Sequence, residues 1–271
     1  MAKEFEFTRN DFKAVQKTVL HISGINLSDH KFEMVYGRLA RRLRATGFRA
    51  VSDYLSFIEE DHEEGIQFIN AITTNLTYFF REKHHFEFIE SKVIDELKVK
   101  HQNDKRVRLW SAGCSTGEEP YSLVFTLESF LKDRSSWDIK VLATDLDTEV
   151  LKKASIGAYS SDRIESIASE KRKSWFDIQN DHALVKDRFK QYIHFKQLNL
   201  MQSWPMKGRF DVIFCRNVLI YFDRQTQQKL IARFRQQLDL GGYLILGHSE
   251  SIGQEGNYFT PIGKTIFRRK S

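Results

Sequence analysis

The stretch LWSAGCSTGEEPYSL, residues 109–123, reads as the end of a strand, a turn containing Gly113 and Gly117, and the start of a helix. This order of elements is typical of a nucleotide-binding loop. Two acidic residues, Glu118 and Glu119, stand where a phosphate-binding loop has lysine or bare backbone amides. The stretch therefore predicts a ligand that suits glycines and carboxylates together.

Strand and helix patterns alternate on both sides of this loop. Strand-like runs occupy residues 106–112, 138–145, 210–217 and 242–249, and helix-like runs occupy residues 120–131, 147–155 and 223–238, the last closed by Gly241 and Gly242. Such alternation predicts right-handed βαβ units and a mostly parallel, Rossmann-like sheet of the α/β class. Residues 258–270 instead predict a terminal antiparallel hairpin that turns at Gly263–Lys264, and residues 176–195 predict a small β insertion.

The first part of the chain has a different texture. Apolar residues recur there at helical spacing, and Thr8 with Asp11 predicts a capping box at the start of the first helix. We expect a small helical domain at residues 1–74, then a linker and a bridging helix at residues 75–100. Residues 101–271 then form the α/β domain, which contains the insertion.

Composition sets further limits on the class of protein. The chain has 271 residues, 41% of them hydrophobic, and a net charge of +6. Its 2 cysteines, Cys114 and Cys215, follow no metal-ligand spacing, so we expect buried reduced thiols and no metal. The start MAKEFEFTRND lacks the apolar region of a signal peptide, and no apolar run has the ~18 residues of a membrane span. These features predict a soluble, cytoplasmic protein.

Ligands of open α/β sheets bind beyond the carboxyl ends of the strands. At those ends the sequence places Asp145, Asn199, and the run Arg216–Val218 followed by Tyr221. An acid at the end of the second strand is typical of a ribose-binding residue, although Asp145 also suits the N-cap of the next helix.

The glycine loop favours one nucleoside ligand over others. Its spacing, G-x-x-x-G, matches neither the dinucleotide fingerprint nor the phosphate-binding loop, and its two glutamates oppose a pyrophosphate. S-adenosylmethionine carries adenosine, a sulfonium and an α-amino group but no phosphate. The residues therefore predict a methyltransferase-like domain, with Glu118 facing the positive amino-acid end of the cofactor and Glu119 pointing elsewhere.

Five motifs resemble one family in order along nearly the whole chain. They are TTNLTYFFRE, SAGCSTGEEPYSL, ATDLDTEVL, FCRNVLIYFD and GHSES, and they resemble the chemotaxis receptor methyltransferases of the CheR family. The resemblance implies methyl transfer from S-adenosylmethionine to glutamate side chains on the cytoplasmic helices of chemoreceptors. The products would be a glutamate γ-methyl ester and S-adenosylhomocysteine.

The resemblance also implies a set of site residues. Positions that match the family's cofactor contacts are Asn75, Thr77, Arg81, Glu118, Asp145, Asn199, Leu200, Asn217 and Val218. In some members the β insertion holds a peptide at the C-terminal tail of the receptor, and the insertion here looks short. The implied partner is thus the receptor's cytoplasmic domain, with no nucleic acid and no insertion into the membrane.

Candidates for catalysis are Arg81 and Tyr221. Arg81 suits a bidentate contact with the carboxylate of either the cofactor or the substrate, and Tyr221 suits a hydrogen bond to the substrate. The alternatives are an ordinary ion pair for Arg81 and core packing for Tyr221. A glutamate with pKa ~4.3 is already ionised at neutral pH, so we expect no general base.

A basic run in the first part of the chain predicts a docking surface. Its arginines, Arg38, Arg41, Arg42 and Arg44, suit the acidic methylation helices of a receptor, and the alternative is a solvated helix face. Two rival functions stay open. A nucleic-acid methyltransferase is disfavoured because CRNVLIYF has no proline and Cys215 follows Phe214. The second rival is a non-catalytic S-adenosylmethionine sensor or receptor adaptor.

Overall fold

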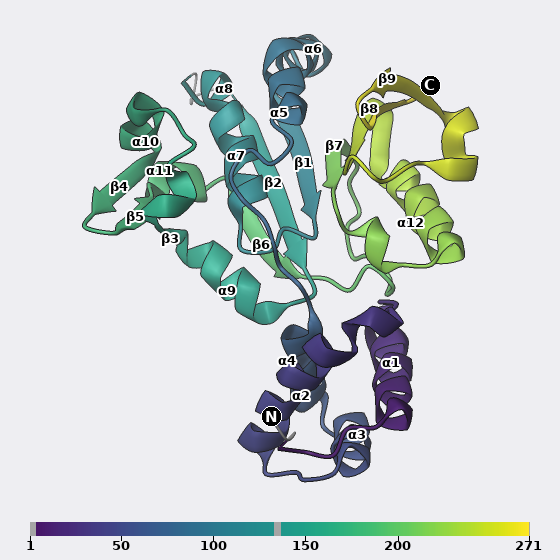
Figure 1. Cartoon of the computed structure of the whole chain (residues 1–271). Coiled ribbons are helices and arrows are strands. Elements are labelled where there is room, and N and C mark those ends of the chain that lie inside the picture. The colour runs from purple at the N-terminus through teal and green to yellow at the C-terminus, as the bar shows by residue number, and fades with distance from the viewer. Residues whose placement is uncertain (1–3, 133–136, 271) are drawn as a thin grey trace.

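A helical bundle and a larger α/β unit make up the chain (Figure 1). The computed structural model describes residues 4–132 and 137–270, so residues 1–3 and 271 of the predicted domain limits lie outside it. None of the described helices is both long enough and apolar enough to cross a bilayer.

Four helices form the bundle: α1 Arg9–Ser23, α2 Phe32–Thr46, α3 Val51–Glu60 and α4 His62–Ile72. The predicted capping box is present at α1, where Thr8 Oγ1 accepts from the Asp11 amide at 3.1 Å and Asp11 accepts from the Thr8 amide at 2.7 Å. Gly24 and Gly47 end α1 and α2 with φ of 74° and 80°, the left-handed conformation that suits glycine. Each helix turns one apolar face into a core around the fully buried Tyr54.

A bridge without regular structure, residues 73–83, connects the bundle to a longer helix. This helix runs through three segments: α5 His84–Phe88, a π-helical turn Ile89–Val93, and α6 Ile94–Lys100. The apolar stripe predicted for it is buried, with Phe86 and Ile89 in the core of the α/β unit. The bridge is therefore held at one end by the bundle and at the other by the sheet domain.

Seven strands form the main sheet in the order β6-β2-β1-β7-β8-β10-β9. Their bounds are β1 Arg106–Ala112, β2 Asp138–Asp145, β6 Ile193–Gln197, β7 Phe210–Cys215, β8 Leu238–Leu246, β9 Phe259–Gly263 and β10 Ile266–Arg269. The strands from β6 to β8 pair in parallel, and β10 and β9 are antiparallel, as predicted. Strand order reverses between β1 and β7, which places a switch point there.

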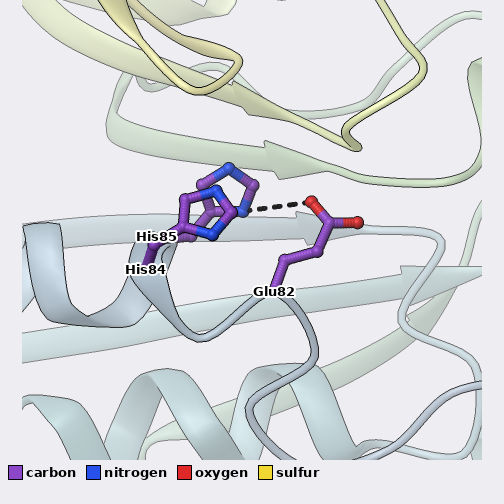
Figure 2. A group of neighbouring side chains, drawn as sticks. All are labelled: Glu82, His84 and His85. Atoms are coloured by element: carbon purple, nitrogen blue, oxygen red, sulfur yellow. Dashed lines mark ion pairs between the residues drawn. The ribbon is translucent and has the colours of Figure 1, made fainter.

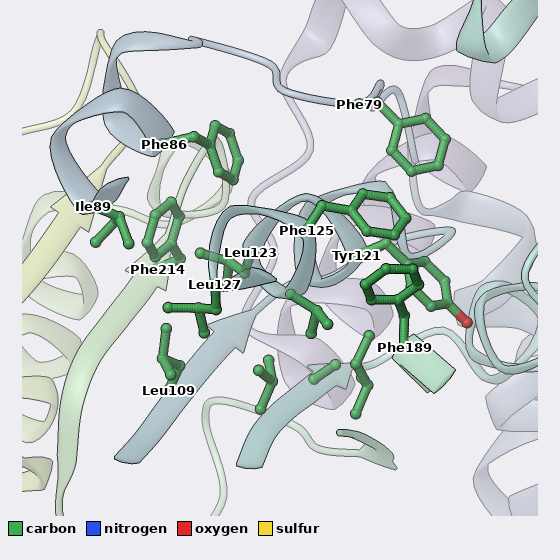
Figure 3. Close-up of a cluster of buried hydrophobic side chains, with 14 of the residues drawn as sticks. Phe79, Phe86, Ile89, Leu109, Tyr121, Leu123, Phe125, Leu127, Phe189 and Phe214 are labelled. Carbon is green, nitrogen blue, oxygen red and sulfur yellow. The ribbon is translucent and has the colours of Figure 1, made fainter. Parts of the chain in front are cut away.

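Helices cover both faces of the sheet, which explains why the strands read as continuous apolar runs. The covering helices are α7 Glu118–Thr126, α8 Glu128–Lys132, α9 Thr148–Ile156 and α12 Arg224–Gln237. In β1, Leu109 packs with Leu123 of α7 in the cluster of Figure 3, and the next residue, Trp110, packs with Phe234 of α12 on the opposite face.

A second, three-stranded antiparallel sheet projects from the α/β unit (Figure 1). It comprises β3 Ala158–Ser160, β4 Phe176–Gln179 and β5 His182–Val185, with helices α10 Ser169–Trp175 and α11 Asp187–Lys190. The insertion predicted at residues 176–195 thus begins earlier, and Ile193–Gln197 belongs to the main sheet instead. The short strand β3 has three residues, AYS, directly before a polar segment, and so short a run carries little strand signal.

Two turn predictions had different outcomes. The predicted hairpin of β9 and β10 is present, but it turns at Lys264 and Thr265, one residue later than the predicted Gly263–Lys264, and their φ angles of 50° and 61° are those of a tight hairpin turn. In contrast, Gly241 and Gly242 do not close helix α12, because α12 ends at Gln237 and the glycines lie inside β8. A Cβ on Gly242 would lie 2.9 Å from a backbone carbonyl oxygen of β7, so the glycine serves close strand approach at an irregular register.

Candidate functional site

A cavity of about 290 Å³ lies between the bundle, the bridge and the carboxyl ends of β1, β2 and β7. Nine of the predicted residues line it: Asn75, Thr77, Arg81, Asp145, Asn199, Leu200, Asn217, Val218 and Tyr221. Of the two loop glutamates, Glu119 lines the cavity and Glu118 does not. The topology therefore brings the predicted residues together at the switch point, except that Glu119 lines the cavity in place of the predicted Glu118.

The glycines of the loop make room for protein atoms. A Cβ on Gly113, which has φ 84°, would lie 2.3 Å from a methyl group of Val218. A Cβ on Gly117, with φ 97°, would lie 2.8 Å from the Cβ of Ala154. The space beside Gly113 is thus filled by the loop after β7, and the space beside Gly117 is filled by helix α9, so both glycines allow close packing of protein segments.

Asp145 ends β2 with its carboxylate held by the backbone. Its Oδ2 accepts from the Ser115 amide at 2.8 Å and its Oδ1 from the Asp147 amide at 3.0 Å. Asp147 is the N-cap of α9, which removes the alternative N-cap role from Asp145. Burial raises the pKa of Asp145 to about 6, although the backbone amides oppose this shift. An anchored acceptor at this strand end suits the hydroxyls of a ribose.

Glu118 connects to the bridge through an arginine. Its fully buried carboxylate forms an ion pair with Arg163 and accepts from Thr116 Oγ1 at 2.6 Å. The same Arg163 Nη2 donates to the backbone carbonyl of Thr77 at 2.9 Å. The Glu118 carboxylate, which was expected to face the cofactor, thus faces Arg163. Helix α7 directs this carboxylate toward the short 3-10 helix Ser161–Ile164, which follows β3 and contains Arg163.

Glu119 connects to the bridge through a second arginine. One oxygen accepts from Ser111 Oγ at 2.7 Å, and the other pairs with Arg216 Nη1 at 3.1 Å. Arg216 Nη2 in turn donates to the backbone carbonyl of Arg81. Burial raises the pKa of Glu119, and Arg216 and Ser111 oppose the shift. Two successive glutamates therefore hold two arginines, and each arginine holds one carbonyl of the bridge; we call these contacts the twin clamp.

Arg81 and Tyr221 approach the cavity from opposite segments. Arg81 is half-buried, and its Nη1 donates to the Leu76 carbonyl at 2.8 Å, which curls the bridge on itself. Tyr221 follows β7, and its hydroxyl lies 3.4 Å from the Thr74 carbonyl. Burial raises the pKa of Tyr221, so its hydroxyl is protonated at neutral pH and is a donor.

The asparagines of the site are oriented by bonds outside the cavity. Asn75 Nδ2 donates to Asp147 at 2.8 Å, and Asn199 Nδ2 donates to the Ile22 carbonyl in α1 at 2.8 Å. Asn217 has φ 58°, a conformation that asparagine tolerates better than most residues. Its amide donates to Glu250 Oε2 at 2.9 Å.

Glu250 has a role that sequence reasoning missed. It is buried, and it accepts from the amides of Asn217, Gly247 and Ile220 at 2.9, 2.6 and 3.3 Å. The acid thereby shapes the loop after β7, next to the cavity. The motif GHSES contains this residue, but motif and spacing give no sign of which amides it accepts from.

The predicted basic docking surface is largely engaged within the chain. Arg38 donates to the Ile72 and Thr73 carbonyls at 2.7 and 2.5 Å, which caps the end of α4. Arg42 binds Glu64 through two hydrogen bonds, and Arg44 pairs with Glu4 at 3.0 Å. Among described residues, Arg41 alone of the four has neither a hydrogen-bond partner nor an ion-pair partner, and it is exposed.

A parallel sheet with this strand order, an acid fixed at the end of β2, and a nucleoside-sized cavity at the switch point define the class of S-adenosylmethionine-dependent methyltransferases. Comparison with known families narrows the class. Residues 75–268 match the family described as CheR methyltransferase, SAM binding domain, and residues 10–73 match CheR methyltransferase, all-alpha domain.

Curated relatives are similar in sequence to this chain along almost their full length. A probable chemotaxis protein methyltransferase of Rhizobium etli is 41% identical, and the match covers 91% of this chain and 94% of the relative. The chemotaxis protein methyltransferase of Borreliella burgdorferi is 38% identical, covering 90% and 89%. That of Escherichia coli is 37% identical, covering 98% and 93%. The chain belongs to the CheR family of chemotaxis protein methyltransferases, and its activity is S-adenosylmethionine-dependent methyl transfer.

Proposed function

We propose that this enzyme methylates glutamate side chains on the cytoplasmic helices of a chemoreceptor, giving γ-methyl esters and S-adenosylhomocysteine. The observation that carries the proposal is the cavity, which places Arg81 and Tyr221 beside residues suited to the cofactor. The enzyme would then act in the cytoplasm, where that part of the receptor lies.

The residues present fit S-adenosylmethionine. Asp145 is an anchored acceptor for ribose hydroxyls. Asn75, Thr77, Asn199, Leu200, Asn217 and Val218 complete the proposed binding set. Arg81 keeps N–H groups beyond the one bonded to Leu76, and these suit the α-carboxylate of the amino-acid end. When bound, the cofactor supplies an electrophilic methyl group. Glu118 joins the set as the residue that fixes the Thr77 segment through Arg163.

The chain's own residues then bind, orient and exclude water. The substrate glutamate is already a carboxylate at neutral pH, so no proton has to be removed from it. Its approach to a sulfonium cancels two opposite charges, which a partly desolvated cavity favours. We propose that Arg81 positions a carboxylate and that the Tyr221 hydroxyl donates a hydrogen bond to the substrate.

The partner surface extends outward from the cavity. We propose that the exposed Arg41 faces the acidic methylation helices of the receptor, and that Arg38, Arg42 and Arg44 add positive charge to the same surface. The C-terminal tail of the receptor is the proposed occupant of the small sheet, because β4 ends that sheet and pairs only with β5 among described residues. Removal of the receptor tail should then lower the rate of receptor methylation.

Transfer of labelled methyl groups to receptor-rich membranes tests the proposal. We expect label that mild alkali releases, as carboxyl methyl esters are labile to base. Arg81→Ala should lower the rate at least ~100-fold, on the scale of losing a positioned charged donor. Base-stable label or label on nucleic acid would overturn ester formation, and cofactor binding without transfer would favour a sensor. Near-normal turnover of Arg81→Ala would remove the proposed role of Arg81.

A further inference from the structure

Three potential metal ligands cluster at the start of α5, outside the cofactor cavity. They are Glu82, His84 and His85, and their ligand atoms all lie within 4.8 Å of one another. Figure 2 shows the two imidazole rings side by side and the Glu82 carboxylate turned toward them. Neither the cofactor site nor the twin clamp uses the two histidines.

The fully buried His85 has one ring nitrogen with a partner and one without. Its Nε2 lies 2.8 Å from the Lys264 carbonyl oxygen and 3.2 Å from Thr265 Oγ1. A carbonyl can only accept, so Nε2 carries the proton and donates it. Nδ1 then presents a lone pair that has no hydrogen-bond partner among the described residues. Metal-binding imidazoles characteristically donate their other N–H to a carbonyl in this way.

Glu82 is the second group without a short hydrogen bond, and its Oε2 lies in a long ion pair with Arg216 Nη2 at 3.6 Å. Both carboxylate oxygens are buried without a hydrogen bond in the described part of the chain. Oε2 lies 3.6 Å from His85 Nδ1, a gap that one ion at ~2.0–2.2 Å from each atom can span. The exposed His248 brings its Nδ1 within 3.7 Å of Oε1, from the loop after β8.

The local charge leaves room for a cation. Arg216 Nη2 lies 3.6 Å from Glu82 Oε2, but the same guanidinium is also paired with Glu119. Two carboxylates thus face one guanidinium, which leaves one negative charge beside imidazoles that are neutral ligands. Unpaired polar atoms in a buried place are costly, and an ion that binds them removes that cost.

We propose that Glu82, His84 and His85 form a binding site for a divalent transition-metal ion of the zinc type, with His248 as a further ligand. Two or three imidazoles with one carboxylate are a donor set typical of Zn²⁺ in proteins. The site would tie the start of α5 to the loop after β8. It departs from the metal-free chain that the sequence predicts.

Calorimetric titration of Zn²⁺ into the full chain, freed of any histidine tag, tests the site. We expect saturable binding of about one ion per chain. His84→Ala should weaken this binding at least ~10-fold, because His84 is half-buried and its removal leaves the hydrogen bonds of His85 intact. Bound Co²⁺ should show the visible absorption of a low-coordinate nitrogen and oxygen site, and this absorption should be lost in His84→Ala.

His182→Ala is the matched control, because His182 is exposed on β5 and lies outside the cluster. It should bind Zn²⁺ as the parent does. Glu82→Gln supplies a second test that does not depend on His84. Absence of saturable binding by the parent, or equal binding by parent and His84→Ala, would overturn the proposal, and either result is independent of methyl transfer.

Discussion

Replacing Glu118 with glutamine tests whether this acid acts through Arg163 or contacts the cofactor directly. The side chain keeps its shape and its place beside Thr116, but it loses the charge that holds Arg163. Arg163 is about one-third exposed, so water compensates part of the loss. A charge-assisted hydrogen bond that becomes neutral loses about 1–1.5 kcal/mol, which corresponds to roughly tenfold weaker binding of the cofactor.

Two ligands separate the two roles of Glu118. S-adenosylhomocysteine carries the amino-acid end, and 5′-methylthioadenosine lacks it. If Glu118 only fixes the Thr77 segment, Glu118→Gln should weaken the binding of both ligands by the same factor, as measured by calorimetry. A direct contact with the α-amino group should weaken S-adenosylhomocysteine alone.

Controls complete this experiment. Arg163→Ala should weaken both ligands as Glu118→Gln does, and the double variant should add little, because the two residues form one unit. Glu255→Gln disrupts an ion pair of similar burial with Arg235, far from the cavity, and should leave both affinities unchanged. Unaltered affinity in Glu118→Gln, or a loss confined to S-adenosylhomocysteine, would refute the clamp.

Four further predictions follow from the contacts described above. Burial raises the pKa of Asp145 to about 6, so the folded chain favours its protonated form. The contribution of Asp145 to the free energy of unfolding is therefore fully present below ~3.9, the pKa in the unfolded chain. This contribution is lost as the pH rises through about 6. Cofactor affinity should change in the opposite direction, falling below pH 6 in calorimetric titrations, and Asp145→Asn should bind weakly without this pH dependence. Arg41→Glu should slow receptor methylation several-fold in an initial-rate assay without changing the melting temperature, since Arg41 has no hydrogen-bond or ion-pair partner within residues 4–132 and 137–270. Arg42→Glu should instead lower the free energy of unfolding by ~3–5 kcal/mol in urea titrations, because it places a second acid beside the buried Glu64; equal stability of the two variants would contradict this. Tyr221→Phe should lower kcat roughly tenfold with little change in cofactor affinity, and an affinity loss as large as the rate loss would contradict a hydrogen bond to the substrate.

Local patterns predicted most of the fold. Strands β1 and β2 fall on the predicted residues because each alternates charged and apolar residues at its start and then carries consecutive buried residues toward its carboxyl end. The part of the cavity lining that lies at strand ends also followed from sequence, since the switch-point rule places strand ends together. Its bridge residues, Asn75, Thr77 and Arg81, came from the family resemblance alone. Short strand β3 and the early start of β8 at Leu238 escaped prediction, because tertiary pairing alone makes those segments extended.

The partners of the loop glutamates were beyond sequence reasoning for a different reason. Glu118 finds Arg163 at 45 positions away, and Glu119 finds Arg216 at 97 positions away. Only the packing of α7 between two other segments selects these arginines. The same holds for Arg38 and Arg42, whose charges suggested a partner protein and whose contacts are largely with α4. A charge pattern shows that partners are needed but does not show where they lie.

The twin clamp holds the bridge by the carbonyl oxygens of Thr77 and Arg81, and it does not use the side chains of Leu76 and Tyr78. Leu76 and Tyr78 are the two neighbours of the clamped Thr77 in the chain, and they are 74% and 52% exposed. Leu76 also lines the cavity, so it would contact a receptor helix that enters the proposed site. If the proposed substrate is correct, replacing these two side chains should change which receptor sequence is accepted, while the pocket for the methyl donor keeps its shape.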